Sequence, residues 1–226
     1  MTGALCLRFC VIACSSAALL LVAKNAGADE LLGALELGLR HELVQDVDLS
    51  GDVQLRLDEG LSRIERWMPE LAIGYEIGRP LTIGAGYRLI YARNARGDFE
   101  IAHRLHLQAA LSFKLKPLGA KLKYRLRLQD RFERQVGEPT EHQPTLRNAL
   151  ELSHTAWAFL KPFVSGEHYL SLDELEDNPT RRWKFMLGVQ HEVGAAELEL
   201  YYRLDVPVGN DDPNRHMIGL GMRIDI

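Results

Sequence analysis

The chain has 226 residues, of which 27 are lysine or arginine and 31 are aspartate or glutamate, so its formal net charge is −4 at pH 7. This acidic balance argues against nucleic acid as a partner, because proteins that bind nucleic acid usually carry a basic excess. The length is sufficient for one large domain, and no low-complexity linker marks a second one.

The first 28 residues have the features of a cleavable export signal. Arg8 supplies a positive charge, residues 9–23 form an apolar run, and Ala26-Gly27-Ala28 fits the small-residue cleavage pattern. The run is shorter than the roughly 18–20 residues of a membrane-spanning helix, although an uncleaved anchor helix is the alternative. We expect residues 1–28 to be a signal peptide for the Sec route and residues 29–226 to form the mature domain.

All three cysteines, Cys6, Cys10 and Cys14, lie in this expected signal peptide. The mature domain would therefore contain no disulfide, no thiolate metal site and no cysteine nucleophile. Removal of the signal takes away Arg8 and Lys24 and no acidic residue, so the mature domain would be more acidic than the whole chain.

Alternation of apolar and polar residues dominates the rest of the chain and predicts β-strands. Many of the segments reach the roughly 9–11 residues that a strand needs to cross a bilayer at a tilt. Short connections alternate with longer ones, as is typical of an outer-membrane barrel. The expected strands are residues 33–43, 51–58, 70–78, 81–91, 99–113, 120–132, 146–156, 162–171, 181–192, 196–205 and 215–226. The longer connections are residues 59–69, 92–98, 133–145, 172–180 and 206–214.

This pattern predicts an all-β fold, a closed antiparallel up-and-down transmembrane β-barrel. Closure pairs every backbone N–H and C=O without water, which is what a sheet in hydrocarbon requires. The number of segments found is odd, whereas bacterial barrels usually have an even number of strands. We therefore expect 10 or 12 strands, with one strand missed or two elements merged near the N-terminus. We expect the barrel to lie in the Gram-negative outer membrane, with outer-membrane lipids and the barrel-assembly machinery as partners.

The segment KLKYRLRLQD (residues 121–130) raises the question of which face is inside. A soluble lipocalin-like barrel turns its apolar face inward, whereas a membrane barrel turns it outward. Aromatic residues on the apolar faces and mixed, arginine-rich charge on the polar faces favour the membrane barrel. The amphipathic last strand, HMIGLGMRIDI, also resembles the assembly signal of such barrels, although that signal usually ends in an aromatic residue rather than Ile226.

Four segments carry a resemblance to a known family: IGAGYRLIY (83–91), IAHRLHLQAALSFKL (101–115), YRLRLQDRF (124–132) and KPFVSGEHYLSL (161–172). They resemble the strands of a family of Gram-negative outer-membrane barrels that is labelled only as a domain of unknown function. The resemblance spans most of residues 33–226. It implies the fold and the compartment, and it supplies no catalytic residues.

The sequence contains no G-x-S-x-G elbow, no H-E-x-x-H spacing and no phosphate-binding glycine loop. We therefore expect no catalytic residues, no metal site and no cofactor. Ser165 and Glu167 do share one face of a strand, and a histidine from a neighbouring strand could join them. An outer-membrane barrel enzyme acting on lipid or peptide is thus the alternative function.

Two groups of cationic residues point to function. The first is a basic wall inside the barrel, facing the acid-rich strands 33–43, 51–58 and 196–205, and it favours a narrow porin-like channel or an envelope structural protein with a charged lumen. A lumen closed by salt bridges is equally compatible with a small barrel. The wall consists of Arg104, His106, Lys123, Arg125, Arg127 and Arg147.

The second group comes from the long loops, which all contain arginine. Near the rim of a barrel these side chains could pair with lipopolysaccharide phosphates, and the candidates for such contacts are Arg131, Arg134 and Arg181. The alternative is that they are solvated loop charges. A third interpretation of the whole chain, a soluble periplasmic barrel that binds an apolar ligand, requires the apolar faces to point inward.

Overall fold

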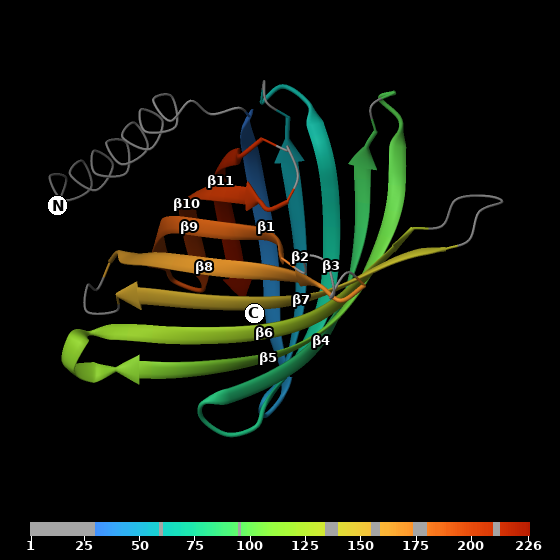
Figure 1. Cartoon of the computed structure of the whole chain (residues 1–226). Helices are drawn as coiled ribbons and strands as arrows, with labels where there is room; N and C mark the ends of the chain where they lie inside the picture. Colours follow the sequence, from blue (N-terminus) through green and yellow to red (C-terminus); the bar gives the residue numbers. More distant parts are fainter. Residues whose placement is uncertain are drawn as a thin grey trace, which may run out of the picture.

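The computed structural model describes residues 30–58, 61–94, 96–133, 140–154, 159–173, 180–209 and 213–226. In this part of the chain eleven β-strands close into a barrel, and the one helical element is a single 3-10 turn, η1 (Lys116–Leu118) (Figure 1). No helix in the described ranges is long and apolar enough to cross a membrane. The strands are β1 (Glu30–Val44), β2 (Val47–Leu57), β3 (Ile64–Glu76), β4 (Leu81–Arg93), β5 (Phe99–Leu115), β6 (Ala120–Glu133), β7 (Glu141–His154), β8 (Lys161–Ser171), β9 (Thr180–Val193), β10 (Ala196–Pro207) and β11 (Arg215–Asp225).

The expected strand number of 10 or 12 was wrong, because the described barrel has eleven strands. Every pair of consecutive strands is antiparallel, and the barrel closes through a parallel pairing of β1 with β11 that runs from Glu30↔Arg215 to Arg40↔Asp225. A parallel pair also satisfies the backbone groups of both edges, so closure does not demand an even number. Each of the eleven segments found by alternation corresponds to one strand, and the assumption of even parity introduced the error.

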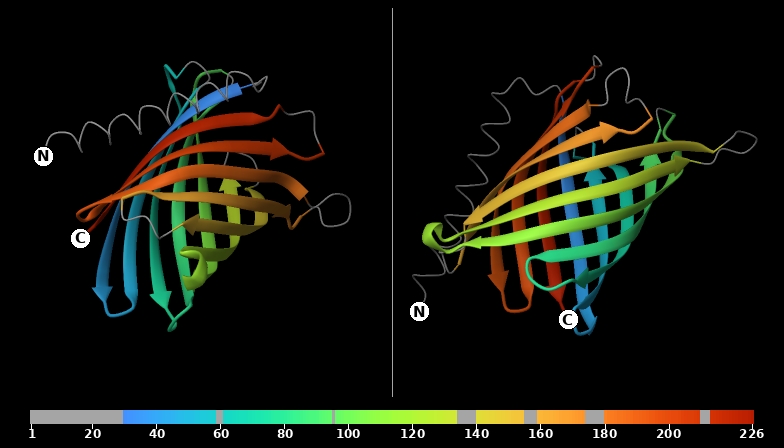
Figure 2. Two further views of the ribbon diagram at one scale, coloured as in Figure 1. Left: turned by 90° about the vertical axis from the view of Figure 1, so that its left-hand side faces the viewer. Right: turned by 60° about the horizontal axis from the view of Figure 1, so that its bottom comes forward.

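The connections gather at two rims, and the strands run obliquely around the barrel between them (Figure 2). The turn rim is formed by the ends of β1, β3, β5, β7 and β9 and the beginnings of β2, β4, β6, β8 and β10. The loop rim is formed by the ends of β2, β4, β6, β8 and β10 and the beginnings of β3, β5, β7, β9 and β11. Because the strand number is odd, β1 begins at the loop rim and β11 ends at the turn rim.

The apolar faces of the strands point outward, as predicted. On β6, Leu126 and Leu128 are 37% and 45% exposed, whereas the intervening Arg127 is 8% exposed. On β1 and β5 the same alternation leaves Leu37 and Leu107 more than half exposed. This orientation is the reverse of what a soluble barrel with an apolar interior requires.

Aromatic side chains on the outer face form a band near each rim. Trp67 stacks on Tyr91 with ring centroids 4.9 Å apart, and His168 stacks on Trp183 at 4.1 Å, all near the loop-rim ends of their strands. Tyr75, Phe113 and Tyr124 are exposed on the strand segments nearer the turn rim. Two such bands are expected where a barrel crosses the two interfaces of a membrane.

Glycines on the inner face seat large side chains from neighbouring strands. A Cβ atom at Gly219 would overlap the ring of Tyr201, and one at Gly188 would lie 2.7 Å from the ring of Phe163. Tyr201 and Phe163 are buried there in a small apolar cluster with Met217. Small and large residues on adjacent strands therefore alternate on the inner face, which lets the large side chains pack against the barrel wall.

Candidate functional site

The barrel encloses a cavity of about 590 Å³ that is lined by side chains from all eleven strands. The described lining contains fourteen arginine or lysine side chains and only seven carboxylates. The whole chain has a net charge of −4, so the cavity is opposite in sign to the protein that surrounds it. Excess positive charge inside low-dielectric walls concentrates field lines and attracts anions.

The predicted basic wall lies on the inner face of β5, β6 and β7. The side chains that line the cavity are Arg104, Lys123, Arg125, Arg127 and Arg147. His106 also faces inward, but it is 4% exposed and packs in the wall beside Gly86. Neither ring nitrogen of His106 has a hydrogen-bond partner among the described residues.

The carboxylates of the cavity lie mainly on the other side of the barrel. In the barrel order, β1 and β2 lie across from β6 and β7. Six of the seven lining carboxylates belong to β1, β2, β3 and β10: Glu36, Asp48, Asp52, Glu70, Glu76 and Glu199. The carboxylates are thus concentrated across the lumen from the cationic wall, on strands that also contribute arginines to the lining: Arg40, Arg56, Arg66 and Arg203.

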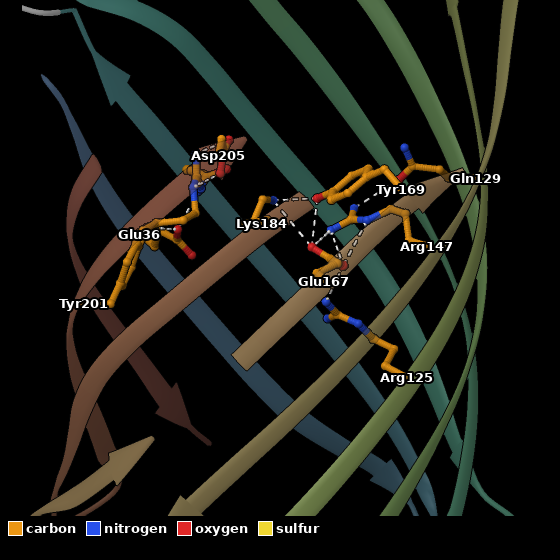
Figure 3. A network of polar contacts seen from close by, with 11 residues as sticks. Glu36, Arg125, Gln129, Arg147, Glu167, Tyr169, Lys184, Tyr201 and Asp205 are labelled. Carbon is orange, nitrogen blue, oxygen red and sulfur yellow. Dashed lines mark hydrogen bonds and ion pairs between the residues drawn. The ribbon is translucent and has the colours of Figure 1, made fainter. Parts of the chain in front are cut away.

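The remaining carboxylate, Glu167 on β8, is surrounded by cations (Figure 3). Arg147 Nη2 donates to Oε1 and Oε2 of Glu167 at 2.7 and 2.8 Å, and Arg125 Nη2 donates to Oε1 at 3.1 Å. Lys184 Nζ lies 3.5 Å from Oε2, which also accepts a hydrogen bond from the Tyr169 hydroxyl at 2.8 Å. One carboxylate therefore neutralises only part of the charge of three cations.

Tyr169 supports this cluster with its ring. The guanidinium carbon of Arg147 lies 4.6 Å from the ring centroid, and that of Arg182 lies 4.3 Å from it. The Lys184 ammonium is 4.9 Å from the same centroid. The negative faces of an aromatic ring attract cations, so Tyr169 holds three positive groups on the cavity wall.

The ion pairs of the barrel run along its wall. Arg88 pairs with Glu70 on the adjacent strand, and Arg203 pairs with Asp205 two residues further along β10. The pairs that reach furthest around the barrel join residues two strands apart. One of them is the pair of Arg223 on β11 and Asp52 on β2, whose charged groups are 3.8 Å apart. Among the described residues, no ion pair joins opposite sides of the lumen, which is the arrangement that a salt-bridge plug would need.

Several arginines face each other directly across neighbouring strands. Like charges at such positions destabilise a sheet. The cavity wall nevertheless contains the cross-strand pairs Arg56↔Arg66, Arg88↔Arg104 and Arg127↔Arg147. This accumulation of cations is not explained by the stability of the sheet.

The arginines expected to contact lipopolysaccharide have different positions. Arg131 lies on the inner face of β6 opposite Arg104, and it contacts Glu133 and Gln143. Arg181, at the start of β9, has its Nη2 3.2 Å from Oδ1 of Asp173. The hydrogen bond from the Ser171 hydroxyl, together with Arg181, lowers the pKa of Asp173. Arg134 lies outside the described residues.

The alternative catalytic arrangement requires a histidine beside Ser165 and Glu167, and the described residues do not provide one. Glu167 is occupied by Arg125, Arg147 and Lys184, and no hydrogen bond joins it or Ser165 to a histidine within the described ranges. In the same ranges no group of three His, Cys, Asp or Glu side chains could hold a metal ion.

Three members of the site, Tyr169, Arg182 and Lys184, were not among the residues predicted from the sequence. The two-residue period does offer a signal, because Tyr169 follows Glu167 by two residues and Arg182 precedes Lys184 by two. What brings the side chains together is the register of β7, β8 and β9, in which Arg147, Tyr169 and Arg182 are direct neighbours.

Comparisons with known proteins place the fold. A family model described as "Protein of unknown function (DUF2490)" matches residues 35–224. No curated protein matches the chain.

Two solved structures are similar in fold. LpxR from Salmonella typhimurium aligns with a TM-score of 0.52 and 9% sequence identity, over 79% of this chain and 83% of that one. The NanC porin aligns with a TM-score of 0.51 and 8% identity, over 82% of this chain and 92% of that one. At these identities the similarity establishes the fold of an outer-membrane β-barrel.

Proposed function

We propose a function for this chain, which belongs to the DUF2490 family of proteins of unknown function: it is a β-barrel of the Gram-negative outer membrane through which small anions pass. The observation that carries this proposal is the cavity, in which the described cations outnumber the carboxylates two to one. An anion entering the lumen is attracted by this excess, whereas a cation is repelled.

The course of the ion pairs supports an open lumen. Small barrels are often filled by their own side chains. In a filled barrel with this many charges, arginines from β5–β7 would pair with carboxylates from β1 and β2 across the centre. The described pairs instead lie on the same strand or at most two strands apart, so none of them crosses the centre of the barrel.

The outer surface supports a membrane location. The exposed face of β6 consists of Tyr124, Leu126 and Leu128, and aromatic residues lie near both rims. Such a surface would be costly in water and is suited to lipid. Outer-membrane fractionation and heat-modifiable migration on SDS gels test the location before any activity is measured.

Conductance in planar lipid bilayers tests the activity. With a KCl gradient across the membrane, we expect single-channel currents whose reversal potential has the sign of a chloride preference. Replacing Lys121→Glu and Lys123→Glu together should shift the reversal potential toward that of potassium, because both side chains line the cavity. The absence of current from properly folded protein would refute the channel and leave a structural role in the envelope.

A further inference from the structure

Four arginines in the half of the cavity near the loop rim lack adequate compensation by carboxylates. They are Arg56 on β2, Arg66 on β3, Arg104 on β5 and Arg182 on β9. Within the described part of the chain, Arg56, Arg104 and Arg182 have no ion pair, and Arg66 has only Glu65, at 3.6 Å. The nearby Asp205 is engaged by Arg203, whose Nε lies 3.0 Å from Oδ1.

These four side chains share one region of the lumen. Arg56 and Arg66 are direct cross-strand neighbours on β2 and β3. Arg182 lies within electrostatic range of Arg56, Arg66 and Arg104, which it repels. The stacking of Arg182 on Tyr169 at 4.3 Å restricts where its guanidinium can lie. Arg182 on β9 is thus the common neighbour of the other three arginines, which come from β2, β3 and β5.

Three of these arginines also have one nitrogen without an acceptor. The Nε atoms of Arg56, Arg66 and Arg104 are buried and have no acceptor among the described residues. Removing a guanidinium from water without an acceptor is costly, and the repulsion between like charges adds to the cost. A solute with several negative oxygens would supply the opposing charge, and its oxygens would accept from the guanidinium groups where these side chains line the cavity.

We propose that Arg56, Arg66, Arg104 and Arg182 form a binding site for a solute whose oxyanion groups, phosphate or carboxylate, carry at least two negative charges. The planar fork of a guanidinium donates to two oxygens of either group at once, and several forks around one region favour a polyvalent anion over chloride. The site deepens the proposed function, on which it rests for its biological role, since it would lie in the path of the permeating anion.

Isothermal titration calorimetry on the detergent-purified barrel tests the site with two probes. Inorganic pyrophosphate represents phosphate chemistry and citrate represents carboxylate chemistry, so the stronger binder identifies the source of the oxyanion. In the double variant Arg56→Gln/Arg104→Gln, we expect affinity to fall by about tenfold or more, because two charge-assisted contacts are lost. Glutamine keeps a polar side chain in the wall, and heat-modifiable migration verifies that the variant folds.

The double variant Lys114→Gln/Lys116→Gln is the matched control. These lysines are exposed at the turn rim and do not line the cavity, and their replacement removes the same charge. We expect this control to bind the probes nearly as well as the unmodified protein. An equal loss in both variants, or no binding of either probe to the unmodified protein, would overturn the site.

Bilayer conductance separates this inference from the channel itself. If the site lies in an open pore, millimolar pyrophosphate should reduce the chloride current of the unmodified protein more than that of Arg56→Gln/Arg104→Gln. Binding without any current would refute the channel and retain the site. Current without binding would refute the site and retain the channel.

Discussion

Arg147 and Glu167 form a buried, multiply hydrogen-bonded ion pair on the inner wall of the barrel. Arg147 Nη2 donates to the two carboxylate oxygens at 2.7 and 2.8 Å, and Nε donates to Oε1 at 3.1 Å. Arg147 also donates from Nη1 to Gln129 at 3.0 Å. The same carboxylate serves Arg125 and Lys184, so the stability of a whole cationic patch depends on one acidic residue.

Replacing Glu167→Gln should therefore destabilise the barrel strongly. The substitution keeps the shape of the side chain but leaves three cations without their counter-charge in a buried setting. Breaking a buried pair from one side costs about 3–5 kcal/mol, and we expect a loss of this order. Urea unfolding of the detergent-solubilised barrel, followed by tryptophan fluorescence, measures it.

Glu76→Gln is the control for that experiment. Glu76 also lines the cavity, but it lies at the end of β3, is exposed, and makes no ion pair with a described residue. We expect its replacement to change stability by less than about 1 kcal/mol, as for an exposed charge. If both variants unfolded at the same urea concentration, the central role of Glu167 would be wrong.

Gly86 and His106 are cross-strand neighbours on β4 and β5, and the histidine ring occupies the space over the glycine. A Cβ atom at Gly86 would overlap this ring and lie 3.0 Å from the Cβ atom of Ala72. We expect Gly86→Ala to cost about 1–3 kcal/mol through overpacking. In the His106→Ala background the ring is absent, so Gly86→Ala should lower the free energy of unfolding much less than it does in the unmodified protein. A double-mutant cycle in the urea assay measures this difference. Strictly additive effects of the two substitutions would contradict the proposed packing.

Alternation along the sequence located a segment for each of the eleven strands and predicted the outward direction of Leu126 and Leu128, because a two-residue period translates directly into two faces. The expected number of 10 or 12 strands came from the even-number rule and was wrong. The same period placed Arg104, Arg125 and Arg147 on the inner face. Eleven up-and-down strands can close only with β1 parallel to β11, so the sense of this seam follows from the strand count, whereas its register depends on the whole sheet and no local pattern encodes it. The position of Arg182 against Tyr169 likewise depends on the register between β8 and β9.

Because the outer face of β6 is apolar, the effect of a new arginine on folding should depend strongly on whether it lies on the outer or the inner face of the barrel. Leu126→Arg would place a charge on the outer face, where arginine costs about 2–4 kcal/mol at the middle of the bilayer. Thr82→Arg adds the same charge to the cavity lining on β4, directly opposite Glu76 on β3, and should be tolerated. Folding into phospholipid vesicles, scored by heat-modifiable migration, should fail or weaken only for Leu126→Arg. Equal folding of both variants would contradict a membrane-embedded outer face.

The parallel seam between β1 and β11 predicts a specific pattern of crosslinks. In the observed register Leu35 lies beside Leu220 and Leu37 beside Met222, so the partner numbers rise together. Only Cys6, Cys10 and Cys14 occur in the natural sequence, all before residue 29, so a domain expressed from residue 29 contains no competing thiol. The pairs Leu35→Cys/Leu220→Cys and Leu37→Cys/Met222→Cys should each form a disulfide on mild oxidation, because neighbouring strands bring Cα atoms within bonding range.

An antiparallel seam through the same first pair would reverse the direction of one strand. Leu37 would then lie beside Ile218 instead of Met222. The variant Leu37→Cys/Ile218→Cys is therefore the discriminating control, and non-reducing gels should show little crosslink for it. Efficient crosslinking of Leu37→Cys/Ile218→Cys, with none for Leu37→Cys/Met222→Cys, would rule out the parallel closure and with it the eleven-stranded barrel.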